Sequence, residues 1–534
     1  MKKSLSKLLT LGKTSAKGGF NLFWGIAISS IITAAAVMIV AGILTEDEYG
    51  LFAIALTAPN LIQLIRDLGI DQATIKYIAQ YKQENKTDKI KNILKSTIIF
   101  ELILGTILTL TTFLLSTFLA TNIFSRPEIM PIIQIASFTI FAQALIKITQ
   151  SAFIGYEKMQ YHSITLVIQS VIKASLMIFL IISGFGVLGA IMGHTIAILT
   201  AGTASMIIFY EKIYKTLKTD NKLELKTNLK NMLKFGLPLS GSIILTGFMT
   251  QFYNFLVAIY VSDSIMGNYQ VTLNFLVLVT FFVTPVSTIL FPAFSKIDGK
   301  KEQTILQNVF GSSVKYASLI IIPTTFMVMS LSQTAVATLF GSKYEFAPIF
   351  LSFYLILYLF TAFGYLSSAN LIKSQGRTDI NLKLGLLSSV IGIILAFSII
   401  PTFGIIGLIT TILVSTLPHI ILSLYWINKN YKAKINLKSS TKIITASALS
   451  ALLTFLTVNT LTTIPNWITL IIGATTYILT YIIIAPILGA ITKTDTKNLK
   501  EMTKTLGPLK TILTLPINLI EYLITKLQKN QNNQ

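Results

Sequence analysis

The chain has 534 residues, of which 53% are hydrophobic and only 12% are charged, compared with roughly 25% charged residues in soluble domains. This composition excludes an ordinary soluble protein and predicts an all-α integral membrane protein. The sequence contains no cysteine, which excludes disulfide bonds and thiolate metal sites. A formal net charge of +22 would favour nucleic-acid binding in a soluble protein, but the distribution of the charges gives a different explanation.

The first long apolar run has no charged residue from Gly18 to Leu44 and follows a basic segment, 1–17. A secretory signal peptide has about 7–15 apolar residues near its start, so this later and longer run predicts a retained transmembrane helix. An acidic turn with Glu46, Asp47 and Glu48 comes next, and we expect it to be solvated. A second apolar run then returns to a lysine-rich loop.

Further apolar runs follow along the whole chain. Each crossing needs about 20 apolar residues, which predicts fourteen transmembrane helices. Their approximate spans are 18–44, 49–70, 92–121, 129–154, 161–184, 187–210, 234–260, 265–292, 314–333, 346–371, 381–400, 403–427, 442–462 and 466–489.

Lysine and arginine gather in every second loop, whereas the loops between them carry only Arg126 and Lys343. Short basic loops stay in the cytoplasm, so both termini are predicted to be cytoplasmic and the protein to lie in the cell membrane. This asymmetry explains most of the net charge. It leaves nucleic-acid binding as the weaker alternative.

The sequence also repeats itself at an offset of 217 or 218 residues. Four groups of residues match: Lys17 and Gly19 with Lys234 and Gly236, Gly50 with Gly267, Ser151-Ala152 with Ser368-Ala369, and Gly186 and Gly189 with Gly404 and Gly407. A duplication explains these matches better than chance. Because each half has an even number of helices, the halves are expected to share one orientation, related by an axis along the membrane normal.

The repeat defines the expected domains. They are an N-lobe at 18–210, a cytoplasmic linker at 211–233, a C-lobe at 234–427, two additional helices at 442–489 and a tail at 490–534. Pro516, Glu521 and Lys526 interrupt the apolar residues of the tail, which favours a helix in the membrane interface over a fifteenth span. A loosely ordered tail is the alternative.

Ionisable residues inside membrane spans are costly and are therefore functional candidates. All clear examples lie in the first half: Arg66, Asp67, Glu101, Lys147 and Lys173. At a rise of about 1.5 Å per residue, Lys173 lies near the middle of the membrane. Residues three or four apart share a helix face, so we expect the polar rows to line one wet cavity. These rows are Asn60, Gln63 and Asp67; Gln143, Lys147 and Gln150; and Gln169 and Lys173.

Two interpretations of these charges remain open. Arg66 could pair with Asp67 or with a lipid phosphate, and Lys147 with Glu101, in which case all four would be structural. Lys173 then has no obvious partner and is the best candidate to contact an anionic substrate. The second half offers neutral candidates, Gln251, Asn254 and Asn274, for which hydrogen bonding between helices is the competing role.

Several segments resemble the multidrug/oligosaccharidyl-lipid/polysaccharide exporter superfamily, and within it the polysaccharide-biosynthesis flippases, which include O-antigen and lipid-linked oligosaccharide flippases. The similarity covers roughly residues 10–490. The segments are EYGLFAIALT after the first helix, DLGIDQATIKYIAQY at the end of the second, and GFGVLGA before the sixth.

The resemblance implies two six-helix lobes around a central cavity and transport by alternating access. The implied substrate is a lipid-linked oligosaccharide on a polyprenyl phosphate or diphosphate, moved from the inner to the outer leaflet for polysaccharide or glycan biosynthesis. A glycan polymerase or glycosyltransferases are possible partners besides the membrane lipids. No cofactor is expected, although a proton or sodium gradient could drive transport.

Two other functions stay open. A cation-coupled multidrug antiporter of the same superfamily would need buried carboxylates, for which only Asp67 and Glu101 are available. A non-transporting scaffold for glycosyltransferases would not need embedded charges. An enzyme is disfavoured, because no catalytic, metal-binding or nucleotide-binding motif is visible.

Overall fold

A computed structural model describes residues 24–66, 68–217, 224–295, 297–299, 301–461, 463–503 and 509–532. Within these ranges the regular structure is entirely helical. The chain forms two compact units, Met1–Gln270 and Val271–Gln534, which are described separately. The boundary lies inside helix α10, so the first unit contains more than the N-lobe expected from the repeat. The lobe boundaries themselves stay a prediction.

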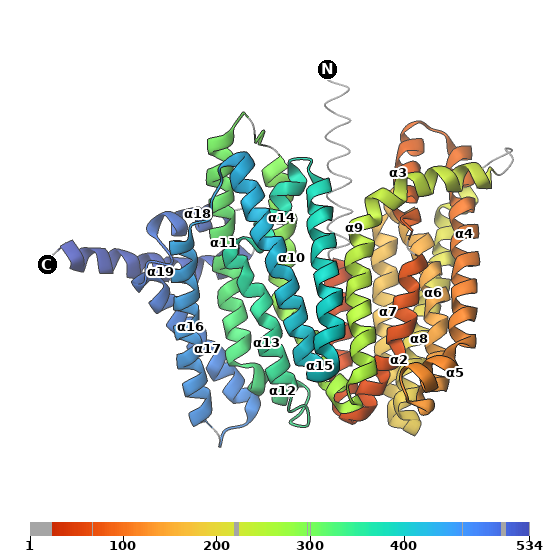
Figure 1. Cartoon of the computed structure of the whole chain (residues 1–534), viewed down its shortest axis with the longest axis horizontal. Coiled ribbons are helices and arrows are strands. Elements are labelled where there is room, and N and C mark those ends of the chain that lie inside the picture. The colour runs from red at the N-terminus through yellow and green to blue at the C-terminus, as the bar shows by residue number, and fades with distance from the viewer. Residues whose placement is uncertain are drawn as a thin grey trace. The chain divides into compact units, whose positions relative to one another are not determined.

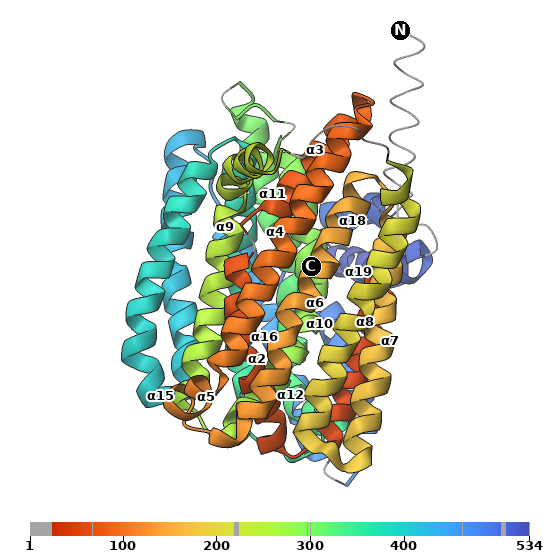
Figure 2. The same ribbon diagram turned by 90° about the vertical axis from the view of Figure 1, so that its right-hand side faces the viewer.

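The first compact unit is a bundle in which α6 and α8 pack against each other and against α4 and α7 (Figures 1 and 2). Small residues on α6 and α8 are completely buried and allow this packing. The helices are Trp24–Ile43, α2 (Glu46–Arg66), α3 (Ile70–Gln83), α4 (Thr87–Leu114), α5 (Ser116–Phe118), α6 (Met130–Gly155), α7 (Met159–Leu180), α8 (Gly186–Lys212), α9 (Leu225–Tyr260) and the start of α10 (Asp263–Ser295), with short turns η1 (Leu119–Ile123), η2 (Pro127–Ile129), η3 (Ile181–Phe185) and η4 (Tyr214–Thr216).

The second compact unit places α16 and α17 side by side, with α11 against α16. Ile322, Ala362 and Ile443 form part of their common apolar core. The remaining helices are α11 (Gln303–Ser330), α12 (Ser332–Leu339), α13 (Ala347–Leu359), η5 (Phe360–Phe363), α14 (Tyr365–Ser374), α15 (Thr378–Tyr431), α16 (Leu437–Thr460), α17 (Asn466–Ile487), α18 (Lys493–Thr503) and α19 (Leu509–Asn532).

Nine helices among the described residues are long and apolar enough to cross a membrane, or ten if the bent pair Ala347–Phe363 and Tyr365–Ser374 forms one span. Two of the nine, Met159–Thr216 and Thr378–Tyr431, each contain a glycine with non-helical backbone angles, Gly184 and Gly404. The helical membrane architecture is therefore confirmed. The count of fourteen spans stays a prediction.

The two glycine turns have the same geometry. Gly186 has φ 50° and ψ −133°, and Gly404 has φ 53° and ψ −126°. L-residues with a side chain rarely adopt these angles, which explains why glycine stands at both positions. Gly189 and Gly407 follow three residues later, and an added Cβ would come within about 3 Å of the preceding helix at both. The sequence repeat is thus also a repeat of backbone conformation.

A second repeated feature joins the start of α2 to the start of α10. A Cβ on Gly50 would lie 1.8 Å from the carbonyl oxygen of Asp263, and one on Gly267 would lie 2.3 Å from that of Glu46. Gly50 and Gly267 are 217 positions apart, as are Glu46 and Asp263. Each contact is therefore the counterpart of the other. Only glycine lets the two backbones approach this closely.

The acidic turn is more ordered than the sequence suggested. Thr45 and Glu48 form a capping box, in which the Glu48 carboxylate accepts from the Thr45 amide at 2.8 Å and the Glu48 amide donates to the Thr45 hydroxyl at 3.2 Å. The carboxylate of Glu46 accepts from Ser264 Oγ at 2.7 Å and from Asn268 Nδ2 at 2.8 Å. The expectation of a merely solvated turn was wrong, because Glu46 and Glu48 each have protein partners.

Candidate functional site

Arg66 and Glu101 form an ion pair in the interior of the first compact unit. Arg66 is the last residue of α2, and Glu101 lies in the middle of α4. Arg66 Nη1 is 2.5 Å from Glu101 Oε2, and the two side chains are only 2% and 3% exposed. A buried charge without a partner is costly, so each of these residues neutralises the other. The pair joins α2 to α4 and is closed to large ligands in this conformation.

Lys147 and Asp71 form a second embedded pair, between α6 and α3. Lys147 Nζ is 3.2 Å from Asp71 Oδ2, and the lysine side chain keeps 31% of its exposure. Asp71 was not among the residues selected from the sequence, because it lies just beyond the predicted span at 49–70. Gly69, with φ 78°, separates α2 from α3 and brings Asp71 into the first turn of α3. The aspartate at the start of the second helical segment was the signal that sequence reasoning missed.

The structure thus pairs the embedded charges differently from the interpretation considered above. Glu101 contacts Arg66 rather than Lys147, and Lys147 contacts Asp71. Straight helices would place Glu101 and Lys147 at similar depth, but helix rotation decides which side chains meet. Asp67, the partner first considered for Arg66, lies outside the described residues.

The polar row on α6 is more accessible than its surroundings. Gln143, Lys147 and Gln150 are half-buried, whereas the intervening residues 144–146, 148 and 149 are buried. The spacing of four and three residues places all three on one face. This face is where a ligand could reach α6.

Lys173 lies on α7, one helical turn after Gln169, and both residues are half-buried. Within the described ranges, Lys173 makes no hydrogen bond and no ion pair. Its charge is therefore not neutralised by the groups that neutralise Arg66 and Lys147. An embedded ammonium in this condition can attract a phosphate or carboxylate.

The neutral candidates are divided between the two compact units. Gln251 and Asn254 lie on α9 in the first unit, and Asn274 lies on the part of α10 that belongs to the second. All three are half-buried. They remain predictions as ligand contacts.

Arg126 has a larger structural role than its place in an outer loop suggested. Its guanidinium forms an ion pair with Asp263 and donates to the carbonyl oxygens of Ala258 at 3.0 Å and Val261 at 2.6 Å. These carbonyls belong to the end of α9 and the turn after it, where the last carbonyl groups of a helix have no donor within the helix. Arg126 therefore fastens the turn between α9 and α10 to the loop that follows α5.

No group of three or more His, Cys, Asp or Glu in the described part of the chain could hold a metal ion. The available chemistry is that of fixed cations and neutral hydrogen-bonding side chains. Such groups can bind an anionic or hydroxyl-rich ligand. These groups alone do not distinguish one such ligand from another.

Two family models match the chain. A family model described as "Polysaccharide biosynthesis protein" matches residues 39–348, more than half of the chain. The chain belongs to this family. A second family model, "Lipid II flippase MurJ", matches residues 246–480 of this polysaccharide-biosynthesis protein.

Two curated relatives from archaea are similar in sequence. The uncharacterized membrane protein MJ1068 of Methanocaldococcus jannaschii is 24% identical over 72% of this chain and 78% of its own length. The probable low-salt glycan biosynthesis flippase Agl15 of Haloferax volcanii is also 24% identical, over 46% of this chain and 51% of its own length.

Solved structures show a shared fold. Lipid II flippase MurJ in an inward closed conformation has a TM-score of 0.71 and 17% identity, covering 87% of this chain and 98% of that one. An inward-facing multidrug resistance MATE family transporter of the MOP superfamily has a TM-score of 0.63 and 18% identity, covering 76% and 94%. The family resemblance inferred from the sequence is confirmed. The MurJ family model, the probable flippase Agl15 and the two solved structures are flippases or transporters rather than enzymes.

Proposed function

We propose that this protein moves a lipid-linked oligosaccharide from the inner to the outer leaflet of the cell membrane by alternating access, for polysaccharide or glycan biosynthesis. Membership of the polysaccharide-biosynthesis family and similarity to a probable glycan flippase support this substrate class. The MurJ-like fold supports a transport mechanism. In this proposal both termini are cytoplasmic, as the basic loops indicate.

The proposed binding site rests on one observation, the charge of Lys173 that no described side chain balances. Arg66 is neutralised by Glu101 inside the protein, and Lys147 is balanced by Asp71. Lys173 has no such balancing group among the described residues. The phosphate of a polyprenyl carrier would neutralise it, since lysine binds phosphate as a point charge. Gln143 and Gln169 would then donate to sugar hydroxyls or phosphate oxygens.

Leaflet exposure in proteoliposomes tests this proposal. Purified protein is reconstituted with a fluorescent lipid-diphosphate oligosaccharide, and a membrane-impermeant lectin reports the sugar on the outer surface. We expect protein-dependent exposure that falls at least about tenfold in Lys173→Ala, because a desolvated charge pair is lost. Lys173→Arg should retain part of the activity. Ser175→Ala, which changes an exposed residue on the same helix, is the matched control.

The outcomes separate the function from the site. If the sugar reaches the outer leaflet equally well with wild type and with Lys173→Ala, the flippase function is supported and the role of Lys173 is overturned. Absence of lectin-accessible sugar would contradict the flippase proposal.

A cation-coupled multidrug antiporter is the second candidate, favoured by the similarity to the MATE transporter fold. The carboxylates of Asp71 and Glu101 are both engaged with basic side chains, which argues against their use in binding a cationic drug. Efflux of an organic cation driven by a proton or sodium gradient, without sugar exposure, would decide for the antiporter.

A further inference from the structure

The two C-terminal helices follow the last apolar helix after a very short link. Helix α17 ends at Ile487, and α18 begins at Lys493. Even a fully extended chain spans at most about 3.6 Å per residue, so this link keeps α18 within roughly 22 Å of the end of α17. If α17 crosses the membrane, α18 must therefore begin close to the membrane surface.

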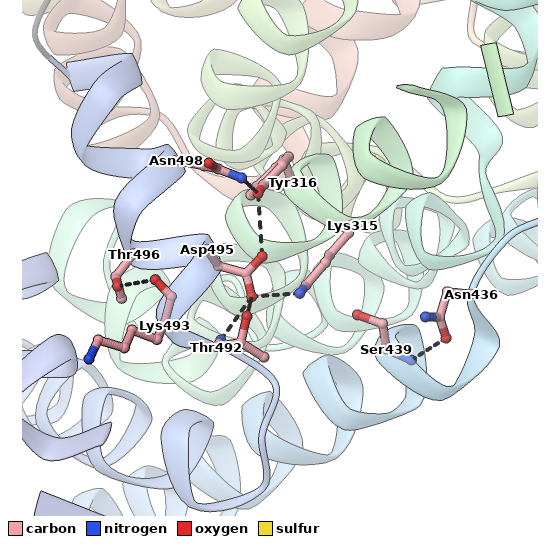
Figure 3. Close-up of polar contacts among 9 residues, drawn as sticks. All are labelled: Lys315, Tyr316, Asn436, Ser439, Thr492, Lys493, Asp495, Thr496 and Asn498. Carbon is pink, nitrogen blue, oxygen red and sulfur yellow. Dashed lines mark hydrogen bonds and ion pairs between the residues drawn. The ribbon is translucent and has the colours of Figure 1, made fainter. Parts of the chain in front are cut away.

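Asp495 fixes α18 to α11. Its carboxylate lies 2.5 Å from Lys315 Nζ and accepts from Tyr316 Oη at 3.3 Å, and both partners belong to α11 (Figure 3). The same carboxylate accepts from the amide and hydroxyl of Thr492, just before α18, at 2.8 and 2.6 Å. Asn498 adds a hydrogen bond to Tyr316 Oη at 2.7 Å. The position of α18 is therefore set by a buried charge network rather than by the link alone.

Helix α19 is attached along one face. Ile520 and Ile524 are buried in an apolar cluster that includes Ile443 of α16 and Ala485 of α17. Glu521 pairs with Lys500 of α18, which joins the two C-terminal helices. Figure 1 shows that α19 runs crosswise to α16 and α17 within the second compact unit.

The face of α19 opposite the attached one is apolar and exposed. Leu515, Leu519 and Tyr522 are 66%, 45% and 63% exposed and share one face at spacings of four and three residues. We call these three residues the outer stripe. Exposed Lys526 continues it by a further turn. A third row, Thr514, Asn518, Glu521 and Thr525, is polar and has the same spacing. Helix α19 thus has three faces: one packs against the protein, one is the exposed apolar outer stripe, and one is polar.

The exposed charged side chains described on α18 and at the end of the outer stripe are lysines. Lys493 and Lys497 of α18 are exposed, like Lys526 of α19. The acidic side chains of Asp495 and Glu521 are already paired with Lys315 and Lys500. Helix α18 is in contact with α19, and an apolar stripe on one helix with exposed lysines on its neighbour matches the boundary between acyl chains and anionic headgroups.

We propose that the outer stripe of α19 inserts into the membrane interface and that Lys493, Lys497 and Lys526 bind the headgroups of anionic lipids. The buried network at Asp495 holds α18 so that α19 lies along the surface. The C-terminal helices then form a lipid-binding surface built from other helices than α6 and α7, which carry the proposed transport site.

Single-cysteine spin labelling tests this arrangement, since the chain contains no cysteine of its own. Nitroxides are attached at Leu515→Cys, Leu519→Cys and Tyr522→Cys, with Asn518→Cys and Thr525→Cys as controls on the polar face. The full-length protein is reconstituted in phosphatidylcholine vesicles with and without phosphatidylglycerol. Collisions with oxygen report contact with lipid, and collisions with a water-soluble nickel chelate report contact with water.

We expect the outer-stripe labels to favour oxygen and the control labels to favour the nickel chelate, with a larger difference when phosphatidylglycerol is present. Replacing Lys493, Lys497 and Lys526 by glutamine should raise the ratio of water-exposed to lipid-exposed label at Leu519→Cys by about fivefold per lysine. The matched control replaces three other exposed lysines, Lys383, Lys429 and Lys434, by glutamine and should change little.

Two results would overturn the proposal. Equal access of the nickel chelate to positions 519 and 525 in both vesicle types would show that the stripe stays in water, as it would if it served a protein partner. Insertion that is the same with and without phosphatidylglycerol, and unchanged by the lysine substitutions, would exclude binding of anionic headgroups.

Discussion

The two compact units use two ion pairs each to join different kinds of helices. In the first, Arg66–Glu101 joins α2 to α4 and Lys147–Asp71 joins α6 to the shorter, more polar α3, and Lys173 on α7 adds a further embedded charge. In the second, Lys315–Asp495 and Lys500–Glu521 attach the C-terminal helices. The backbone turns at Gly186 and Gly404 are nearly identical. The repeated segments therefore share a backbone conformation, whereas the ion pairs Arg66–Glu101 and Lys147–Asp71 are particular to the first unit.

The largest expected effect comes from breaking the buried pair of the first unit. Replacing Glu101 by leucine leaves the Arg66 guanidinium buried without its carboxylate, which should reduce the free energy of unfolding by about 3–5 kcal/mol. The midpoint of thermal unfolding in detergent is the measurement.

The double variant Arg66→Met/Glu101→Leu is the control, since it removes both charges and should regain most of the stability. A Glu101→Leu protein as stable as the wild type would show that the pair does not hold α2 to α4.

A smaller and more local effect is expected in the second unit. Asp495→Asn removes the charge that balances Lys315 and weakens the hydrogen bonds to Thr492, so the attachment of α18 should lose about 2 kcal/mol. Hydrogen exchange of the α18 amides measures this loss. The exposed pair Arg377–Asp379 supplies the matched control, and Asp379→Asn should leave α18 unchanged. Protection of α18 that survives Asp495→Asn would contradict the role of this network.

The attachment of α18 should also depend on pH. Burial raises the pKa of Asp495, but hydrogen bonds from Lys315 and Thr492 lower it, and the net pKa lies below its usual value. A carboxyl whose pKa is depressed on folding stabilises the folded state above its unfolded pKa of about 3.9, and this stabilisation is lost as the pH falls through the folded pKa. A spin label at Lys497→Cys should therefore become mobile as the pH falls below about 4. With Asp495→Asn added, its mobility should no longer change over this range.

The smallest effect is expected at Lys147–Asp71, the less buried of the two pairs in the first unit that were described as embedded. The Lys147 side chain is 31% exposed, so water can partly replace its lost partner and Asp71→Asn should cost only about 1 kcal/mol. A double-mutant cycle with Lys147→Met measures the coupling energy, which should be clearly smaller than that of Arg66 and Glu101. Equal coupling energies would mean that burial does not distinguish the two pairs.

Much of the fold could be predicted from local sequence. Long apolar runs, basic loops and the repeated glycines gave the helical membrane architecture and the position of two equivalent turns. The candidate site was predicted less well. Asp71 could be recognised as a partner only from the helix break at Gly69, which places it in the first turn of α3. The partner of Glu101 depends on the rotation of α2 and α4 about their axes. The hydrogen bonds of Glu46 reach Ser264 and Asn268, which are remote in sequence, so no local pattern reveals them.

The reciprocal contact at Gly50 and Gly267 has a consequence for the origin of the chain. Gly50 packs against the backbone of Asp263, four residues before Gly267, and Gly267 packs against that of Glu46, four residues before Gly50, which is how identical subunits meet across a two-fold axis. A half-length ancestor could have formed this contact as a homodimer before its gene was duplicated and fused. In such a dimer a single mutation would alter both contacts at once. In the fused chain each glycine can mutate alone, and the two copies of the interface are free to diverge.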